Sequence, residues 1–410
     1  MLHPEMKVLI ANKFFYRKGG SETVMFQERD FLLASGVDVV DFSMQDERNL
    51  ASPYQETFVS ARSYDEDAKG GLIARAGAAL RLVHSPEAVS KIGELIDRTR
   101  PDLVHCHNVY HQLTPSIIGA AKQRGVPVVL TLHDYKPICP VYTCLRDGET
   151  CVQCIDNNFF NVVRNRCSDG SLARSALLYA EAKVQQMKRS YENVDLVIAP
   201  SQFMASKVSQ ARFESARVQV LYNAVDASTI TASKEDDGYL LYLGRLSAEK
   251  GIETLVEAQA RANVAPLVVA GTGPLEARLH ADYPDVDFRG HLSGAELEAT
   301  IRKAAAIVIP SRWFENCPMS VLEAMAYGKP VIGSDIGGIP ELVQHEVTGL
   351  LFPAGDTDAL AGQITRLMEQ PKLRKSYGCA ARQRLEQEFS IDTHNQKLLQ
   401  LYNSVVNAAA

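Results

Sequence analysis

The sequence lacks the long hydrophobic runs of an integral membrane protein. No stretch approaches the roughly 20 apolar residues of a membrane-spanning helix, and residues 1–10 lack the architecture of a secretory signal peptide. Basic residues are outnumbered as well, 43 against 49 acidic ones, which gives a net charge of −6. This balance argues against a general nucleic-acid binder. We therefore expect a cytoplasmic protein with no nucleic-acid partner.

Internal repeats and low-complexity tracts are absent too, and the composition is that of an ordinary globular protein. Of the 410 residues, 46% are hydrophobic and 22% are charged, as in soluble domains. The length is too great for one hydrophobic core. We expect a first domain at residues 1–203, a second domain at residues 204–388 and a final helix at residues 389–410.

Short apolar runs alternate with helical patterns through both halves. Each half is therefore expected to be an α/β domain with a right-handed parallel sheet, of the Rossmann-like type. The expected strands lie at residues 7–11, 37–42, 101–107, 127–135 and 194–201 in the first half. In the second half they lie at residues 217–223, 239–244, 266–270, 286–290, 306–310, 330–334 and 348–352. Such sheets bind ligands at the carboxyl ends of their strands.

One stretch, residues 314–323, carries two glutamates at the junction of a strand and a helix. Glu315 follows the apolar run, and Glu323 lies one to two turns into a helix that should end near Ala326. The first N–H groups of such a helix bind phosphate, and carboxylates accept hydrogen bonds from hydroxyls. The pattern favours a pyrophosphate flanked by a sugar and a ribose. The alternative is a buried turn with two incidental glutamates.

Two cations follow the strand expected at residues 239–244. Arg245 and Lys250 lie on one loop that leads into a helix, where both side chains can hold a diphosphate. Taken alone, they fit an ordinary surface Arg and Lys better. Gly271 lies in a glycine turn after the next strand, and Arg289 ends the strand after that, where backbone groups can meet a nucleobase.

The first half contributes a glycine pair and histidines. Gly19 and Gly20 lie between the first strand and a helix, where a ligand or another backbone can approach closely. His133 ends a buried strand and should point at the ligand crevice. His105 and His107 alternate along another strand, so they face one side, either as a ligand pair or as packed core residues.

Five cysteines are concentrated in an insert at residues 139–167. A reducing compartment favours metal binding over disulfides, and the two-residue gap before Cys154 suits zinc. The candidate ligands of a structural Zn²⁺ site are Cys139, Cys151, Cys154 and Cys167, with Cys144 left over. The alternative is a loop of free thiols. Two pairs of aspartates at 285/287 and 356/358 are weaker candidates for a divalent metal.

Two segments raise the question of membrane contact. Residues 159–191 carry six basic side chains against two acidic ones, which suits an anionic lipid or a phosphate-bearing acceptor. Residues 71–84 are apolar with basic residues and no acid, and such a helix can lie on a membrane surface. Both segments fit ordinary solvated helices as well. A peripheral contact with the inner membrane face is therefore one of two open interpretations.

The motifs together resemble the retaining GT-B glycosyltransferases of glycosyltransferase family 4, of the type found in bacterial polysaccharide and lipopolysaccharide synthesis. The resemblance covers essentially the whole chain. It is carried by residues 244–251, then residues 315–323, then the glycine pair and glutamate of residues 337–341, in that order and spacing. It implies two facing Rossmann-like domains and a last helix that crosses back to the first domain.

The resemblance also implies roles for individual residues. Arg245 and Lys250 would neutralise the departing diphosphate, His133 would lie beside the donor sugar, and Glu315 would contact the sugar hydroxyls. Gly19 and Gly20 would approach the diphosphate, and Glu323 would bind the ribose. The other donor-binding positions are Gly271, Arg289, Asn316, Cys317, Met319, Ser320 and Val321.

The expected activity is transfer of a hexosyl group from a nucleoside-diphosphate sugar to a hydroxyl of a glycan or lipid-linked acceptor. Preorganised cations and a helix end stabilise the charge that develops on the diphosphate, so no catalytic metal is needed. Front-face attack, with the leaving phosphate oxygen as base, would retain the anomeric configuration. A nucleotide-sugar epimerase or hydrolase and a silent nucleotide-binding scaffold are the alternatives.

Overall fold

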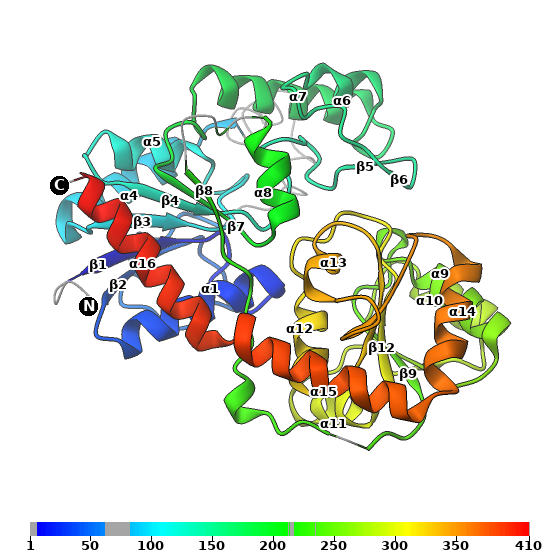
Figure 1. Ribbon diagram of the computed structural model, residues 1–410. Helices are drawn as coiled ribbons and strands as arrows, with labels where there is room; N and C mark the ends of the chain where they lie inside the picture. The colour runs from blue at the N-terminus through cyan, green and yellow to red at the C-terminus, as the bar shows by residue number, and fades with distance from the viewer. Residues whose placement is uncertain (1–5, 62–82, 212, 214–216, 234, 410) are drawn as a thin grey trace.

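The computed structural model describes residues 6–61, 83–211, 213, 217–233 and 235–409. It has two α/β domains side by side, and the last two helices together run along both (Figure 1). Both main sheets are parallel at every strand pairing. The expected fold class, α/β with two Rossmann-like parallel sheets, is confirmed.

The first domain is built on a sheet of six strands. Their order is β2 (Asp38–Phe42), β1 (Lys7–Ala11), β3 (Leu103–Cys106), β4 (Val128–Thr131), β7 (Leu196–Ala199) and β8 (Arg217–Val220). The strands are buried apolar runs, and alternate side chains face opposite sides. Leu9 and Val104 face α4 (Pro86–Thr99) and α5 (Ser116–Lys122). Val8 and Leu103 face α1 (Gly20–Ala34) and α16 (Ile391–Ala409).

The expected boundary at residue 203 lies too early in the chain. Strand β8 pairs with β7 in the first sheet, and α8 (Gln202–Ser209) contacts both strands. The first domain therefore extends through residue 220. Periodicity identified the strand at residues 217–223, but the sheet that a strand joins depends on pairing across the chain, which local sequence does not encode.

The second domain has the strand order β11 (Asp287–Phe288), β10 (Leu267–Ala270), β9 (Leu240–Leu243), β12 (Ala306–Ile309), β13 (Val331–Ser334) and β14 (Gly349–Phe352). Helices α9 (Ile252–Ala262), α10 (Glu276–Asp282) and α14 (Thr357–Met368) cover one face. The other face carries α11 (Gly294–Lys303), α12 (Met319–Ala326), α13 (Ile339–Leu342) and α15 (Pro371–Glu388). The order reverses between β9 and β12, where doubly wound sheets bind ligands.

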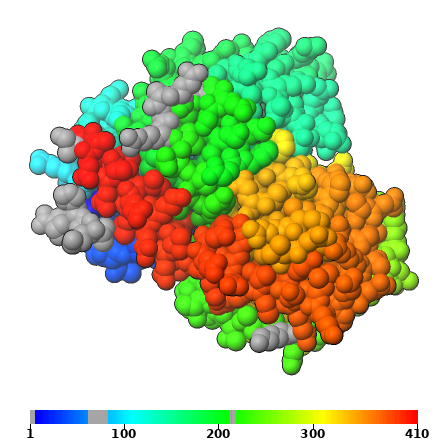
Figure 2. Space-filling view, in the orientation of Figure 1, coloured from blue at the N-terminus to red at the C-terminus, as the bar shows by residue number. Residues whose placement is uncertain are grey.

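The cysteine-rich insert forms a separate layer on the first domain. It contains the hairpin β5 (Leu145–Arg146) and β6 (Glu149–Thr150), then α6 (Phe160–Arg164) and α7 (Leu172–Met187). Figure 2 shows this layer (teal) above the second domain (yellow and orange). An ion pair of 3.3 Å between Glu149 and Arg312 connects it to that domain.

The last helix returns to the first domain, as expected. After α15, helix α16 crosses from the second domain to the first (Figure 1). Its residues Leu398, Tyr402 and Val405 are buried in the core beneath β1 and β3. The expected amphipathic helix at residues 71–84 lies mostly outside the described residues. In the described part of the chain, no helix has the length and apolar character required to cross a membrane.

Glu341 connects the two domains through one end of a helix. Its carboxylate accepts hydrogen bonds from the backbone N–H of Gln202 at 2.7 Å and of Phe203 at 2.6 Å. These groups belong to the first turn of α8, where N–H groups lack partners and the helix dipole favours negative charge. The hydroxyl of Tyr222 donates to the same carboxylate at 2.9 Å.

We predict that Glu341→Gln lowers the free energy of unfolding by about 1–2 kcal/mol, because it removes the charge that complements the α8 dipole and one of two acceptors. Urea unfolding measures the change. Glu388→Gln is the control: Glu388 is half-exposed and pairs with Arg384 within one helix, so its effect should stay below about 0.5 kcal/mol. Equal effects of the two variants would contradict the role of Glu341.

Candidate functional site

A cavity of about 410 Å³ lies between the two domains and gathers most of the expected site residues. From the second domain it is lined by Arg245, Lys250, Glu315, Asn316, Cys317, Met319 and Ser320, and from the first by Gly20 and His133. Strands β9 and β12 are hydrogen-bonded neighbours, so the loops at their carboxyl ends open side by side. This pairing joins two motifs that lie about 65 residues apart.

Lys250 and Glu315 form the charged centre of this cavity. The ammonium of Lys250 donates to Glu315 Oε1 at 2.7 Å and lies 4.8 Å from the centre of the Trp313 ring. Ser311 donates to the same oxygen at 2.6 Å. Arg245 is exposed, and among the described residues it has no side-chain acceptor or ion pair. One cation is thus fixed by a carboxylate, and the other is available to a ligand.

The carboxyl of Glu315 is ionised despite its burial. Only 7% of the residue is exposed, and burial alone would raise its pKa. The charge and hydrogen bond of Lys250, together with the Ser311 hydrogen bond, outweigh burial and hold the pKa below its ordinary value. Glu315 therefore orients Lys250 as a permanent partner. The expected contact of Glu315 with sugar hydroxyls stays a prediction.

The glycine pair before α13 supports the Glu315 loop directly. A side chain at Gly338 would place its Cβ 1.7 Å from the Asn316 carbonyl oxygen, and Gly337 has a positive φ of 61°. The Gly338 N–H donates to the Glu315 carbonyl at 2.7 Å. The glycines thus allow two backbone segments to touch, and this contact holds the loop at the cavity wall.

The start of α12 faces the cavity without a side-chain cap. Its N-cap residue is Pro318, which makes no capping hydrogen bond, and Met319 and Ser320 line the cavity. Gly20 of the first domain lies opposite. A Cβ built on Gly20 would lie 3.7 Å from Met319 Cγ. Val321 is fully buried, and its N–H already donates to the Pro318 carbonyl. An anion at this helix end would therefore contact the N–H groups before Val321.

Asn316 and Cys317 position the two domains around the cavity. The side-chain amide of Asn316 donates to the backbone carbonyl of His133 at 2.7 Å. Cys317 is buried, and its carbonyl accepts from the Asn223 amide at 2.9 Å. These contacts place His133 opposite the Glu315 loop. Burial lowers the pKa of His133 to about 4, so its imidazole is neutral near pH 7.

Besides Val321, four expected donor residues do not line this cavity. Gly19 caps the start of α1 beside it. Gly271 has a φ of 146°, and a Cβ there would lie 1.8 Å from the Gly244 carbonyl oxygen, so it allows close packing behind the cavity. Arg289 pairs with Asp287 at 2.7 Å. Glu323 is half-buried on α12, and desolvation raises its pKa to about 7. Their roles toward a donor stay predictions.

The cavity also contains residues that were not selected from the sequence. Trp313, Tyr142, Asn108 and Asp134 line it. Burial raises the pKa of Asp134 to about 6, near the working range of a proton-transferring group. The available signal was its position directly after His133 at the end of β4. No sequence pattern marked Tyr142, which the insert brings to the cavity.

The five insert cysteines converge on one small cavity of about 20 Å³. Cys139, Cys144, Cys151, Cys154 and Cys167 all line it. A hydrogen bond from the Cys144 thiol lowers the pKa of Cys139 to about 7, although burial opposes this. The expected zinc ligands thus share one site, with Cys144 as a fifth member. In the described part of the chain, only Glu28, His105 and His107 bring three ligand atoms within 4.8 Å of one another.

Three of the four aspartates considered as metal ligands are engaged in other contacts. Asp287 pairs with Arg289, Asp356 caps the start of α14 through the Ala359 N–H, and Asp358 pairs with Arg261. These carboxylates stabilise local structure in the second domain.

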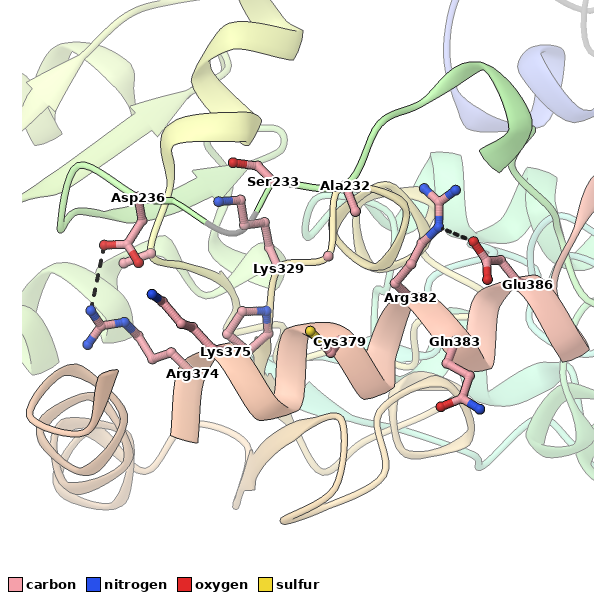
Figure 3. A pocket seen from close by; sticks show the side chains of 13 residues that line it. Ala232, Ser233, Asp236, Lys329, Arg374, Lys375, Cys379, Arg382, Gln383 and Glu386 are labelled. Atoms are coloured by element: carbon pink, nitrogen blue, oxygen red, sulfur yellow. Dashed lines mark hydrogen bonds and ion pairs between the residues drawn. The ribbon is translucent and has the colours of Figure 1, made fainter. Parts of the chain in front are cut away.

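A second cavity, of about 360 Å³, lies between α15 and the loop at residues 232–236 (Figure 3). Three of the four cations that line it have partners: Arg374 pairs with Asp236 at 3.6 Å, and Arg382 pairs with Glu386 at 2.6 Å. The ammonium of Lys329 donates to the Glu235 carbonyl at 2.8 Å. None of the expected site residues lines this cavity, so the chemistry is assigned to the inter-domain cavity.

Two family descriptions match the chain, one for each half. "Glycosyltransferase Family 4" matches residues 18–229, and "Glycosyl transferases group 1" matches residues 226–384. The sulfoquinovosyl transferase SQD2 of Arabidopsis thaliana is 26% identical over 322 residues, which cover 75% of this chain and 57% of that protein. A glycogen synthase of Mycobacterium tuberculosis is 33% identical over 201 residues, 46% of this chain and 48% of that protein. The match thus spans about half the length of these relatives.

Solved structures share the arrangement of both domains. Sucrose-phosphate synthase from Thermosynechococcus elongatus has a TM-score of 0.73 at 20% identity, covering 98% of this chain and 100% of that chain. HepE of Anabaena in complex with UDP has a TM-score of 0.66 at 18% identity, covering 97% and 100%. These likenesses show the GT-B fold of two facing Rossmann-like domains. Because the Family 4 match spans more than half of the 410 residues and the fold agrees with it, the protein belongs to glycosyltransferase family 4.

Proposed function

We propose that this protein transfers a hexosyl group from a nucleoside-diphosphate sugar to a hydroxyl of a glycan or lipid-linked acceptor, with retention of the anomeric configuration. The pathway we propose is bacterial surface polysaccharide synthesis. The observation that carries the proposal is the inter-domain cavity, which combines an unpaired guanidinium, a carboxylate-bound ammonium and the uncapped start of a helix.

These groups match the charge that develops in glycosyl transfer. Breaking the sugar–phosphate bond places negative charge on the diphosphate, and Arg245, Lys250 and the N–H groups of α12 would stabilise it. His133 and Glu315 lie on opposite walls, where a sugar would be held. Retention follows if the acceptor hydroxyl attacks from the face of the leaving group and gives its proton to the departing phosphate oxygen.

Relatives supply support for the donor and the pathway. Solved HepE structures contain UDP and UDP-glucose. Similar curated proteins include an amylovoran biosynthesis glycosyltransferase of Erwinia amylovora and an O-antigen chain mannosyltransferase of Escherichia coli. A lipopolysaccharide outer core galactosyltransferase shares the fold. These names favour a nucleoside-diphosphate donor and a polysaccharide acceptor for this chain.

Trp313, the single tryptophan, lines the cavity and provides a direct binding assay. We predict that UDP, GDP or ADP changes its fluorescence, and that Arg245→Ala weakens this binding on the order of 10–100-fold by removing a charged hydrogen bond. Arg261→Ala, on α9 and paired with Asp358, is the control and should bind like wild type. No saturable response to any nucleoside diphosphate would refute the proposed function.

Mass spectrometry together with proton NMR of the products separates glycosyl transfer from its alternatives. A nucleotide sugar and an acceptor should give a glycosylated acceptor with the donor's anomeric configuration. An epimerised or hydrolysed donor without glycosylation would identify an epimerase or a hydrolase. Nucleotide binding without any turnover would identify a silent scaffold. Either result would replace the proposal.

We also propose that the insert contacts anionic lipid at the inner membrane face. Helices α6 and α7 expose Phe160 (55%), Leu172 (53%) and Met187 (74%). Arg164, Arg166 and Arg174 are exposed on the same segment. Exposed apolar and cationic side chains within one segment suit an anionic bilayer.

Changing Arg164, Arg166 and Arg174 to Gln together should weaken binding to phosphatidylglycerol vesicles on the order of 100-fold, since each cation contributes roughly 1 kcal/mol. Vesicle co-sedimentation measures this. The matched control changes three arginines that form ion pairs at the surface of the second domain, Arg261, Arg278 and Arg366. Unchanged vesicle binding of the insert variant would remove the membrane contact from the proposal.

The cysteine cluster is proposed as a structural zinc site, since thiolates are preferred zinc ligands. Elemental analysis of protein purified without chelators should find about one zinc per chain, and Cys154→Ser should lower this content and the melting temperature. Cys379→Ser is the control, because Cys379 is exposed and lies outside the cluster on α15. Absence of zinc from the wild-type protein would leave the cluster as free thiols.

A further inference from the structure

Behind His133, a group of polar side chains is buried in the first domain. His105 lies on β3, His107 directly follows it, and Glu28 lies on α1. The returning helix α16 adds His394 and Tyr402. All five are at most 7% exposed. Buried polar side chains are normally hydrogen-bonded, so each of these five should have a partner.

A short chain of contacts leads from Glu28 to His133. His107 Nδ1 lies 3.0 Å from His133 Nε2, and the two rings stack with centres 5.3 Å apart. On its other side, His107 Nε2 lies 3.5 Å from Glu28 Oε2. These last two atoms are buried and have no hydrogen-bond partner among the described residues. They face each other, so a modest shift of either side chain joins them.

His394 fixes which Glu28 oxygen can accept a hydrogen bond. Its Nδ1 lies 2.7 Å from the Tyr222 carbonyl oxygen, which can only accept, so Nδ1 carries a proton. Its Nε2 lies 3.1 Å from Glu28 Oε1. One proton lies between Nε2 and Oε1, whether on the imidazole or on the carboxyl. In both cases Glu28 Oε2 remains an acceptor. It lies 3.5 Å from His107 Nε2 and 3.5 Å from His105 Nδ1, and His105 Nδ1 has a nearer partner in the Tyr402 hydroxyl at 2.6 Å.

The acceptor Glu28 Oε2 determines which ring nitrogens of His107 and His133 carry a proton. His107 is fully buried, and burial holds its pKa well below its ordinary value, so the ring is neutral and carries one proton. That proton lies on Nε2, toward Glu28, and leaves Nδ1 as an acceptor. His133 Nε2 must then donate to His107. In neutral His133, Nδ1 is left without a proton, and among the described residues it has no partner.

We propose that Glu28 and His107 are positioning residues that hold His133 in the tautomer with an unprotonated Nδ1 available to the cavity, and that His394 on the returning helix holds Glu28. An unprotonated ring nitrogen accepts a hydrogen bond from a sugar hydroxyl and repels a phosphate oxygen. His133 would thus select the hydroxyl-bearing part of the donor. This role rests on the proposed function, because it assumes a sugar in the cavity.

Glu28, His105 and His107 also meet the spacing of a metal site. The contacts of His105 argue against that interpretation. Its Nδ1 lies 2.6 Å from the Tyr402 hydroxyl, and its Nε2 lies 2.7 Å from the Thr131 hydroxyl. Both ring nitrogens are therefore engaged, which leaves no ligand atom for a metal.

Two variants of Glu28 test the positioning role. In Glu28→Gln, the amide nitrogen can donate to His394 Nε2 while the oxygen stays toward His107, so the tautomer and most activity should be retained. Glu28→Met has similar volume but no acceptor. We expect it to mix the His133 tautomers and to lower kcat/KM for the nucleotide sugar roughly 10–100-fold. A packing role alone would make the two variants equivalent.

The tautomer is measured directly by ¹⁵N NMR of the histidine rings, with His133→Asn to assign the signals. His107→Phe keeps the ring stacking and removes the acceptor, and it should behave like Glu28→Met. Tyr402→Phe removes only a contact to His105, so it should lower the melting temperature and leave the His133 signals unchanged.

The outcomes separate the two proposals. If wild-type His133 carries its proton on Nε2 but no nucleotide sugar turns over, the proposed function fails and the hydrogen-bond chain stands. If turnover occurs and His133 carries its proton on Nδ1, or Glu28→Met leaves the tautomer unchanged, the positioning role is overturned. A metal found in the wild-type protein and lost in Glu28→Met would overturn it too.

Discussion

The buried carboxylate of Glu315 sets the geometry of this protein's central cavity. A carboxylate that is 7% exposed requires a cation and hydrogen-bond donors, and Lys250 and Ser311 supply them. Because Lys250 follows β9 and Glu315 follows β12, the ion pair holds the loop after β9 against the loop after β12. It thereby fixes one ammonium at a cavity wall and leaves the exposed Arg245 beside it for a ligand. The glycine pair before α13 then allows the supporting backbone to approach.

Contacts between the domains extend the same arrangement to the first domain. Glu341 binds the start of α8, and Asn316 binds the backbone of His133. The returning helix contributes from the opposite side, through His394 on Glu28. His133 is therefore held by its backbone from the second domain and by its ring from the core of the first. The inter-domain cavity lies between the two lobes, and these contacts hold one residue of its wall from both lobes.

The fold could be predicted almost completely from the sequence, because each strand is a short apolar run and each helix follows with its own period. Most of the cavity could be predicted as well, since Arg245, Lys250, Glu315 and His133 all follow strand ends, which meet at one edge of a parallel sheet. The expected domain end at residue 203 was wrong, because β8 joins the first sheet through pairing. Asp134 and Tyr142 carried no pattern of their own.

The sequence by itself determined the two parallel sheets, the loops that carry charge and the helix that opens at Met319, since these depend on local periodicity and on residue types at strand ends. Only the tertiary structure decided that Glu28, His107 and His394 form one chain of close contacts leading to His133. Those residues come from segments up to 366 positions apart. Their contacts arise when β3 and β4 pair and when α1 and α16 cover the same face of the sheet, and no local pattern records that arrangement.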